Sequence, residues 1–320
     1  MKVLLTGCAG FIGSNLLDYM LKDSFQVIGI DNLSTGKIEH INNHLNNSNF
    51  VFHNLDLKDT DKLEKINCRG VNLIIHLAAN ADVRFGLDHP SKDLEENTIV
   101  TFNVLELARN NNIKQFAFSS TGSIYGEPEL IPTPENAPFP IQTSLYGASK
   151  LACEGLIQAY SEGYGMRSFI FRFVSIMGPR YSHGHVYDFY KQLLQNPDRL
   201  HLLGDGNQRK SYLHVSDCIS AIFTVIKNSK DNINIFNLGV DDTCTVKQSA
   251  NWISQYLSIT PNITFEGGER GWIGDNPHIH LSIEKLKSLG WINKYSIEQS
   301  VKDTIKYLES NQWIIDIVNE

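Results

Sequence analysis

The stretch Met1-Lys2-Val3-Leu4-Leu5-Thr6-Gly7-Cys8-Ala9-Gly10-Phe11-Ile12-Gly13 contains the pattern that decides the fold. Residues 1–6 form a short apolar run typical of a buried strand, and residues 11–21 carry apolar side chains at helical intervals. Three glycines lie between them at a spacing of three. This order favours a dinucleotide-binding turn, in which a pyrophosphate approaches the N-terminus of the helix. The spacing differs from G-x-G-x-x-G, and the alternative is a glycine-rich turn without a ligand.

A second apolar run, residues 25–30, ends in Asp31, eighteen residues after Gly13. A carboxylate at this place can accept hydrogen bonds from both ribose hydroxyls of NAD and would repel the extra phosphate of NADP. The alternative is an ordinary aspartate at the end of a strand. We therefore expect the cofactor to be NAD.

Strand-like and helix-like segments continue to alternate along the chain. Such alternation favours a parallel sheet covered on both faces. We predict an α/β fold with a Rossmann-type doubly wound parallel sheet and a smaller α/β C-terminal substrate domain, because the pattern loosens after Val174. The first domain would comprise residues 1–174 plus about 213–240, and the second about 175–212 plus 241–320. The segments with strand character are residues 50–52, 71–77 and 116–118, and residues 93–111 have a helical pattern.

The composition is that of an ordinary globular protein: 320 residues, of which 42% are hydrophobic and 20% charged. A net charge of -7 argues against a nucleic-acid-binding surface. The five cysteines are scattered and form no Cys-x-x-Cys, which favours a reducing compartment. No apolar run is long enough to cross a membrane. We expect a soluble cytoplasmic protein that binds neither nucleic acid nor membrane.

Tyr146 and Lys150 are the candidate catalytic pair. They lie four residues apart, about one helical turn, so the phenol and the ammonium project from the same face. A cation about 4 Å from a phenolate contributes roughly 4 kcal/mol at an effective dielectric constant of about 20. At about 1.36 kcal/mol per pKa unit, a tyrosine pKa of about 10 would fall toward about 7, which suits a base. The alternative is a surface Tyr/Lys pair, which is how we interpret the second Tyr-x-x-x-Lys, Tyr187 to Lys191.

Together these motifs resemble the extended short-chain dehydrogenase/reductase family, and within it the NAD-dependent sugar-nucleotide epimerases and dehydratases. The resemblance covers nearly the whole chain. Thr121 precedes Tyr146 by twenty-five residues, an interval typical of the family, whereas Tyr187 has Glu162 at that distance. The matching residues are Gly7, Gly10, Gly13, Asp31, Asp56-Leu57, His76-Leu77-Ala78-Ala79, Asn97, Ser119-Ser120-Thr121 and Tyr146-x-x-x-Lys150.

The resemblance implies a mechanism and a set of contacts. Tyr146 would take the proton from the sugar O4 while NAD accepts the C4 hydride, Lys150 would lower the tyrosine pKa and bind the nicotinamide ribose, and Thr121 would hydrogen-bond O4. A buried strand-end hydroxyl is the alternative for Thr121. The implied cofactor contacts are Gly7, Gly10, Phe11, Ile12, Gly13, Asp31, Asn32, Asp56, Leu57, Leu77, Ala78, Ala79, Asn97, Ser119, Tyr146, Lys150 and Val174.

The outcome of the reaction depends on the residues at the end of this strand. The family's 4,6-dehydratases usually carry Thr-Asp-Glu where this chain has Thr121-Gly122-Ser123. Without those carboxylates, elimination lacks its general acid and base. We therefore expect a 4-epimerase of the UDP-hexose type. The alternatives are a 4-dehydrogenase that releases a 4-keto sugar, and a non-catalytic NAD-binding module.

The expected substrate is a nucleotide-diphosphate sugar held by the second domain. Its implied contacts are Thr121, Ser175, Arg209, Lys210 and Arg270. Lys210 stands where the family commonly has an arginine, which replaces a bidentate fork by a point charge. Ser175 stands where 4-epimerases often have Asn, so GDP- and CDP-sugars stay possible.

Two further expectations concern metals and assembly. The histidine pairs 183/185 and 278/280 lack a third ligand at a suitable spacing, so we expect no metal site. By resemblance, the helices over residues 93–111 and 146–160 would form a four-helix interface in a homodimer.

Overall fold

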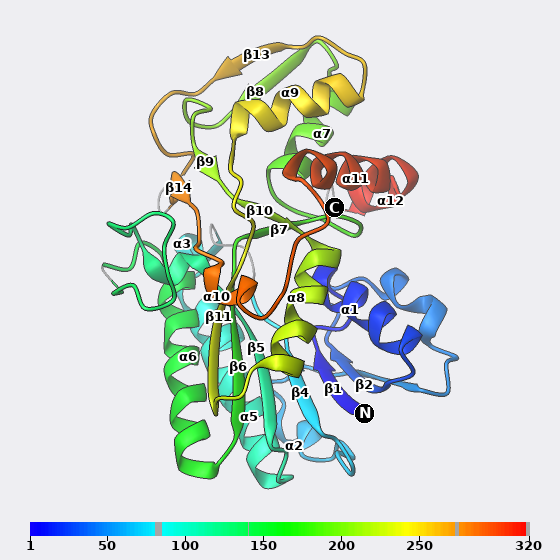
Figure 1. The fold of residues 1–320 in the computed structure, drawn as a ribbon. Helices are drawn as coiled ribbons and strands as arrows, with labels where there is room; N and C mark the ends of the chain where they lie inside the picture. The colour runs from blue at the N-terminus through cyan, green and yellow to red at the C-terminus, as the bar shows by residue number, and fades with distance from the viewer. Residues whose placement is uncertain (81–84, 140, 273–274, 318–320) are drawn as a thin grey trace. The chain divides into compact units, whose positions relative to one another are not determined.

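The computed structural model describes residues 1–80, 85–139, 141–272 and 275–317. The chain forms two compact units, each assembled from three separate segments (Figure 1). The first unit comprises residues 1–126, 138–173 and 222–236, and the second comprises residues 127–137, 174–221 and 237–320. The binding role that we predicted for each part of the chain stays a prediction.

A seven-stranded sheet in the order β11-β6-β5-β4-β1-β2-β3 forms the centre of the first unit. The five strand pairs from β6 to β3 are parallel, and the predicted α/β class is confirmed. The strands are β1 (Lys2–Thr6), β2 (Gln26–Asp31), β3 (Phe50–Asn54), β4 (Leu73–His76), β5 (Gln115–Thr121), β6 (Arg167–Phe173) and β11 (Ile233–Leu238), the last of which crosses between the units.

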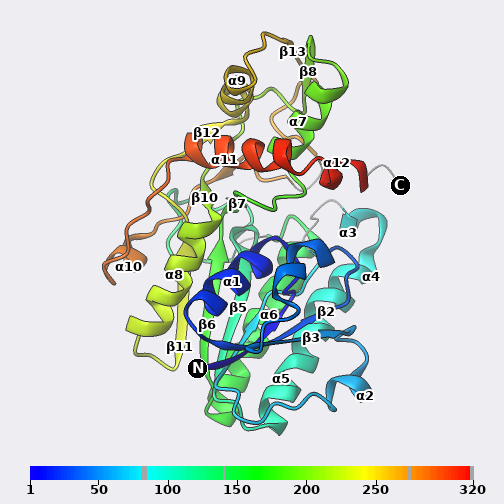
Figure 2. The same ribbon diagram turned by 90° about the vertical axis from the view of Figure 1, so that its right-hand side faces the viewer.

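Helices cover both faces of this sheet (Figure 2). Helix α1 (Phe11–Lys22) packs on β1 and β2, whereas α5 (Val100–Asn110) and α6 (Leu145–Tyr164) share one core with Leu4, Ile74 and Phe116. Strands covered on both faces need continuous apolar runs, which explains residues 3–5 of β1 and 73–75 of β4. The shorter elements are η1 (Ile38–His40), η2 (Asn42–His44), α2 (Thr60–Leu63), α3 (Phe85–Asp88), α4 (Pro90–Asp93), η3 (Leu94–Ile99) and η4 (Gly122–Tyr125).

The register of the strands brings their carboxyl ends to one edge. Thr6 at the end of β1 lies beside Ile30 in β2 and His76 in β4, and His76 lies beside Phe118 in β5. In open parallel sheets this edge is where ligands bind. The glycine turn, Asp31 and Thr121 all follow strands at this edge.

Two predicted helices are confirmed, one with a deviation. Helix α6 begins after Ser144, whose side chain accepts a hydrogen bond from the Gly147 amide, and ends at Gly165, whose φ is 62°. The helix expected over residues 93–111 is instead α4, a π-helical turn (η3) and α5. Such π-turns are frequent at functional sites.

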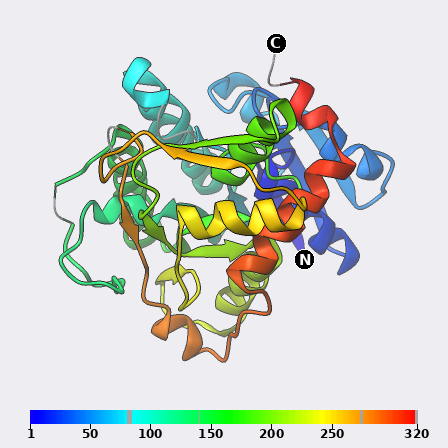
Figure 3. The same cartoon turned by 90° about the horizontal axis from the view of Figure 1, so that it is seen from above.

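The second unit is built around three packed helices, α7 (His185–Gln195), α9 (Val246–Tyr256) and α11 (Ile297–Ser310), of which α9 and α11 lie side by side in Figure 3. Small sheets accompany them. No helix within the described residues is long and apolar enough to span a membrane. The other elements are β7 (Ser175–Met177), β8 (Arg199–Leu202), β9 (Arg209–Lys210), β10 (Tyr212–His214), α8 (Val215–Asn228, which crosses between the units), β12 (Cys244–Thr245), β13 (Asn262–Phe265), β14 (His278–Ile279), α10 (Glu284–Lys287) and α12 (Trp313–Ile317).

Candidate functional site

The glycine turn after β1 depends on close backbone packing. Gly7 has a φ of 69°, and a Cβ there would lie 2.8 Å from the Ala78 nitrogen. A Cβ on Gly13 would lie only 1.9 Å from the Gly7 carbonyl oxygen. Both positions therefore exclude any side chain. A Cβ on Gly10 would come within 4 Å of one atom alone, the Gly7 oxygen at 3.3 Å.

The N-terminus of α1 presents a suitable place for an anion. Its N-cap is Gly10, no side chain caps it, and its first turn carries no acidic residue. The first backbone N–H groups of a helix have no partner within the helix, and the helix dipole favours negative charge there. Phe11 and Ile12, the predicted pyrophosphate contacts, are the first residues of this turn. The turn therefore fits the pyrophosphate of a dinucleotide.

Asp31 is buried at the end of β2 and connects the glycine turn to the next loop. Its Oδ2 accepts a hydrogen bond from the Ala9 amide, and its Oδ1 accepts one from the Leu33 amide, both at 2.9 Å. Burial raises the pKa of Asp31, and the backbone N–H donors oppose the rise. Each carboxylate oxygen can accept more than one hydrogen bond, so this arrangement also fits a ribose diol. The contact with Ala9 joins residues 22 positions apart and could not be predicted from the sequence.

Three of the predicted cofactor contacts, Asn32, Asp56 and Leu57, follow β2 and β3. Asn32 donates from Nδ2 to Asp56 Oδ2 over 3.3 Å, and the carbonyl of Leu57 accepts from Asn103 Nδ2 over 3.0 Å. The side chain of Leu57 belongs to the core shared with α5. These contacts bring the predicted residues of two neighbouring strand ends together.

A buried chain of hydrogen bonds holds the loop after β4. The Thr6 hydroxyl lies 2.7 Å from His76 Nδ1 and also accepts from the amides of Leu77 and Ala78. Burial lowers the pKa of His76 to about 3, so the imidazole is neutral. Because Thr6 is already an acceptor, its O–H donates to Nδ1, which leaves the Nε2–H to donate to Thr101. These hydrogen bonds hold the backbone of Leu77 and Ala78, two of the residues that we predicted to lie beside the cofactor.

Asn97 occupies the π-turn and connects three parts of the unit. Its Oδ1 accepts from the Asn80 amide at 2.9 Å, and its Nδ2 donates to Ser149 at 2.9 Å and to Asp93 at 3.2 Å. Ser149 belongs to α6, between Tyr146 and Lys150. Asn97 therefore positions the helix that carries the predicted catalytic pair.

The predicted catalytic residues lie together at the carboxyl end of β5. The Thr121 hydroxyl lies near the phenol of Tyr146, where it favours the ionised form. It donates to Ser123 Oγ at 3.2 Å and accepts from the Ser123 amide at 3.1 Å. Lys150 Nζ donates to the Ser119 carbonyl at 2.9 Å and lies 6.0 Å from the centre of the Tyr146 ring.

The expected lowering of the tyrosine pKa by Lys150 is wrong for the side chains of this chain alone. Burial raises the pKa of Tyr146, and the Thr121 hydroxyl only partly opposes the rise. Burial also lowers the pKa of Lys150 to about 8. The reason is geometric: the ammonium points toward the Ser119 carbonyl and the face of Phe118, 4.7 Å away, rather than toward the phenol oxygen.

An ion pair that we did not predict lies one turn further along α6. Glu154 and Arg172 are both buried, and Arg172 donates two hydrogen bonds to the Glu154 carboxylate. A sequence signal exists, because Arg172 interrupts the apolar run of β6 and therefore needs a buried partner.

In the second unit, two of the basic residues that we predicted to contact the nucleotide-diphosphate sugar form ion pairs within the protein. Lys210 Nζ donates to Asp275 Oδ1 at 2.6 Å and lies 4.9 Å from the centre of the Trp272 ring. Arg270 forms an exposed ion pair with Glu127. These pairings could not be read from the sequence, and the binding role of these cations stays a prediction.

The other predicted residues of this unit have structural contacts. Arg209 Nη1 donates to the Thr243 hydroxyl at 3.3 Å. Ser175 is an exposed residue of β7 and pairs with Tyr212 of β10. Val174, which we predicted to contact NAD, is assigned to this unit and donates its amide hydrogen bond to Leu238.

The second Tyr-x-x-x-Lys is not a surface pair, and that interpretation is wrong. Tyr187 is buried in α7, and its hydroxyl donates to the Ile314 carbonyl at 3.5 Å. Among the histidines considered for metal binding, His185 hydrogen-bonds Ser249 and His183 stacks on Tyr181. Within the described ranges, no group of three or more His, Cys, Asp or Glu side chains could hold a metal ion.

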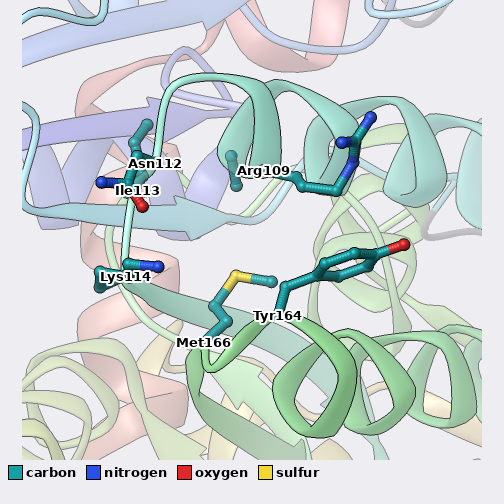
Figure 4. A pocket seen from close by; sticks show the side chains of 7 residues that line it. Arg109, Asn112, Ile113, Lys114, Tyr164 and Met166 are labelled. Carbon is teal, nitrogen blue, oxygen red and sulfur yellow. The ribbon is translucent and has the colours of Figure 1, made fainter.

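A cavity of about 210 Å³ lies away from these residues (Figure 4). Arg109 and Tyr164 face each other across it from neighbouring helices. Ile113 and Lys114 precede β5 and Met166 precedes β6, so this cavity lies at the amino ends of the strands, opposite the edge used by the candidate site.

A doubly wound parallel sheet, a glycine turn with a carboxylate at the next strand end, and a Tyr–Lys pair beside a threonine define a dinucleotide-dependent enzyme of the short-chain dehydrogenase/reductase class. Within that class, the chain belongs to the NAD dependent epimerase/dehydratase family, whose model matches residues 3–239. It is an NAD-dependent sugar-nucleotide enzyme of the extended type.

Relatives and solved structures match the chain over nearly its full length. A putative UDP-glucose 4-epimerase of Methanocaldococcus jannaschii is 32% identical over 97% of this chain and 99% of its own. The structure of UDP-glucose 4-epimerase from Thermotoga maritima with UDP-glucose has a TM-score of 0.88 at 30% identity, covering 98% of this chain and 100% of that chain. UDP-glucuronic acid 4-epimerase from Bacillus cereus, in complex with UDP-glucuronic acid and NAD, has a TM-score of 0.89 at 27% identity, covering 97% and 99%.

Proposed function

We propose that this chain is a 4-epimerase of UDP-hexoses. The observation that carries the proposal is the cluster of Tyr146, Lys150 and Thr121 at the carboxyl end of β5, beside a strand end that offers no carboxylate. Dehydration across C5 and C6 needs a general acid and a general base, and Gly122 and Ser123 supply neither. The names of the relatives, which are UDP-sugar 4-epimerases, support the same activity.

Each catalytic side chain has one task in this proposal. Tyr146 takes the proton from the C4 hydroxyl of the sugar and later returns it, and Thr121 donates a hydrogen bond to the same oxygen. Lys150, which donates a hydrogen bond to the Ser119 carbonyl, places a positive charge near the Tyr146 ring. When bound, NAD supplies the hydride acceptor and the positively charged ring that offsets the effect of burial on Tyr146.

We further propose that the first unit binds NAD and that the second binds the nucleotide sugar through Lys210, Arg209, Arg270 and Ser175. On binding, Lys210 would then give up its hydrogen bond to the Asp275 carboxylate and donate to a phosphate oxygen instead. The functional enzyme would be a homodimer.

The test is proton NMR of UDP-, GDP- and CDP-sugars incubated with the purified protein and NAD, with the Tyr146→Phe variant as control. A mixture of two C4 epimers without accumulated NADH is the expected result and names the nucleotide. A 4-keto sugar with matching NADH would replace the epimerase by a 4-dehydrogenase. No change in any sugar would favour a non-catalytic NAD-binding protein.

A further inference from the structure

The Glu154–Arg172 ion pair is one of the most deeply buried polar groupings of the first unit. The side chains are 1% and 2% exposed. Arg172 Nε donates to Glu154 Oε1 at 3.1 Å and Nη2 donates to Oε2 at 2.8 Å. This two-pronged geometry is specific to arginine and a carboxylate.

Further hydrogen bonds attach the pair to the strand that carries the catalytic threonine. The Ser120 hydroxyl donates to Glu154 Oε1. Arg172 Nη1 donates to the Tyr125 hydroxyl at 2.6 Å, and the guanidinium lies 5.0 Å from the centre of the same ring. The pair therefore joins α6, β6, η4 and the end of β5.

This network continues the candidate catalytic site. Tyr146, Lys150 and Glu154 follow at intervals of four along α6 and share one face. Three consecutive residues of β5 contact this face: Thr121 contacts Tyr146, Ser119 contacts Lys150, and Ser120 contacts Glu154.

Fold stability alone does not explain two charges at this place. Replacing a buried ion pair by apolar side chains of similar volume is often neutral or stabilising, because the pair must lose its hydration. This pair lies between the helix and the strand that carry the proposed catalytic residues. Its two charges can therefore also influence the ionisation of the neighbouring side chains.

We propose that Glu154 and Arg172 are a positioning pair for catalysis. They hold α6 against the end of β5, and their opposite charges cancel one helical turn from Lys150. This balance sets the pH range in which Tyr146 acts as the base. This inference rests on the proposed function, and its test is arranged so that the two can fail separately.

The other ionisable groups facing the site leave room for this effect. His76 and Cys153 are neutral, because burial lowers the pKa of His76 to about 3 and raises the pKa of Cys153. The charge of Asp93 acts on both Tyr146 and Lys150, whereas the charge of Glu154 acts on Lys150. The Tyr125 hydroxyl accepts a hydrogen bond from Arg172.

Glu154→Gln is the decisive variant, because it leaves the permanent charge of Arg172 uncompensated. Glu154 lies eight residues from Tyr146, about 12 Å along the helix. At that distance one charge shifts a pKa by on the order of one unit. A positive charge favours both the phenolate and the neutral amine. Both limbs of the pH profile of kcat/KM, which the ionisations of Tyr146 and Lys150 set in the enzyme with NAD bound, should therefore move to lower pH by on the order of one unit.

Arg172→Met should move both limbs the other way. The shift should be smaller, since an unpaired buried carboxylate can be neutralised by a proton. The double variant Glu154→Gln/Arg172→Met restores the balance and should return both limbs to their wild-type positions. A purely structural role would lower stability in all three variants and leave the limbs in place.

The experiment measures kcat/KM from about pH 6 to about pH 10 and, separately, the tyrosinate absorbance of the protein with and without NAD, from which the titration of Tyr146→Phe is subtracted. Glu298→Gln, which removes one partner of an exposed ion pair with Lys302 on α11, is the matched control and should shift nothing. Opposite shifts in the two single variants support the proposal, and limbs within about 0.2 pH units of wild type in folded Glu154→Gln overturn it.

Two milder variants keep the proposal testable if the single-charge variants do not fold. Ser120→Ala removes a hydrogen bond from Glu154 and should move the limbs up, whereas Tyr125→Phe removes one from Arg172 and should move them down. Unmoved limbs in both would contradict the proposal. If the wild-type protein converts no sugar, the proposed function fails, but the absorbance titration of Tyr146 still decides the role of the pair.

Discussion

Tyr146 and Lys150 are placed where burial opposes the charge that each must carry. The pKa of the phenol is raised and that of the ammonium is lowered to about 8. Desolvation disfavours the charged form of both groups, so neither side chain is held there for stability.

Tyr146→Phe should reduce kcat by at least about 10³-fold and leave NAD affinity within about twofold, because only the proton-transferring oxygen is lost. Steady-state turnover and NAD titration measure the two quantities. The second Tyr-x-x-x-Lys supplies the control. Tyr187→Phe removes one buried hydrogen bond, costs about 1 kcal/mol of stability and should keep full turnover. Equal loss in both variants would refute the assignment of Tyr146.

Lys150→Met should stabilise the protein at neutral pH while abolishing turnover. The fall of the Lys150 pKa from 10.5 to about 8 corresponds to about 3 kcal/mol of destabilisation by the buried charge. The substitution also leaves the Ser119 carbonyl without its hydrogen-bond donor, which lowers the stability by about 1 kcal/mol. A net gain of about 2 kcal/mol in the free energy of unfolding is expected at pH 7.

The sign of the pH dependence follows from the lowered pKa. Between about pH 8 and about pH 10.5 the unfolded chain binds the extra proton, so wild-type stability rises with pH and the advantage of the variant disappears. Urea unfolding at both ends of this range measures it. Lys302→Met, at an exposed ion pair, should change little at either pH. A Lys150→Met protein that is less stable at pH 7 would contradict the expectation.

At the scale of the element, two glycines of the same turn should respond differently to substitution: Gly13 should affect mainly stability, and Gly10 mainly NAD binding. Gly13→Ala places a methyl 1.9 Å from a backbone oxygen and should destabilise the fold by about 3 kcal/mol or more. Gly10→Ala meets one atom at 3.3 Å, so it should cost at most about 1 kcal/mol and act mainly by weakening NAD binding at the helix N-terminus. Thermal unfolding and NAD titration distinguish the two.

A helical glycine with open space around it is the control for this pair. A Cβ on Gly163 of α6 meets no atom within 4 Å, so Gly163→Ala should raise stability by up to about 1 kcal/mol and leave NAD affinity unchanged. If Gly10→Ala binds NAD as tightly as wild type, α1 does not hold the pyrophosphate.

Most elements of the sheet could be predicted, because strands buried on both faces have unmistakable apolar runs. The errors lie where a local hydrogen bond overrides the pattern. Residues 71–77 were expected to be one strand, but the Val71 amide bonds to Cys68 in a turn, and β4 begins at Leu73. The π-turn at residues 94–99 changes the spacing of a helix without changing its apolar pattern, so periodicity could not reveal it.

The candidate site was predictable where a motif carries its chemistry within a short stretch. Tyr146, Lys150 and the glycines are of this kind. Contacts between distant residues were not predictable: Glu154 meets Arg172 eighteen residues away, and Lys210 meets Asp275 sixty-five residues away. The prediction of a lowered pKa for Tyr146 failed for the same reason, because the burial of the phenol and the direction of the Lys150 ammonium depend on the packing of distant residues.

At the scale of the whole molecule, an apolar surface crosses α5 and α6. Phe102 is 42% exposed and packs edge-on against Tyr160, which in turn lies 5.0 Å from Tyr164. Ile99 is 43% exposed on the adjacent turn. Exposed apolar side chains gathered in this way are typical of an interface.

We expect a homodimer at micromolar concentration in sedimentation, and Phe102→Asp should convert it to a monomer with unchanged circular dichroism. Ile292 is 79% exposed in the second unit and serves as the control, since Ile292→Asp should stay dimeric. A wild-type monomer would refute the predicted assembly, and a dimeric Phe102→Asp protein would place the interface elsewhere.

The two units are interleaved along the chain, since each takes three separate segments. The sheet of the first unit receives its edge strand, β11, only after residue 232, when much of the second unit has already been made. A ribosome therefore cannot release one finished unit before starting the other. In evolution, a single crossover between two genes cannot exchange one unit for another, because each unit takes segments from both sides of any crossover point.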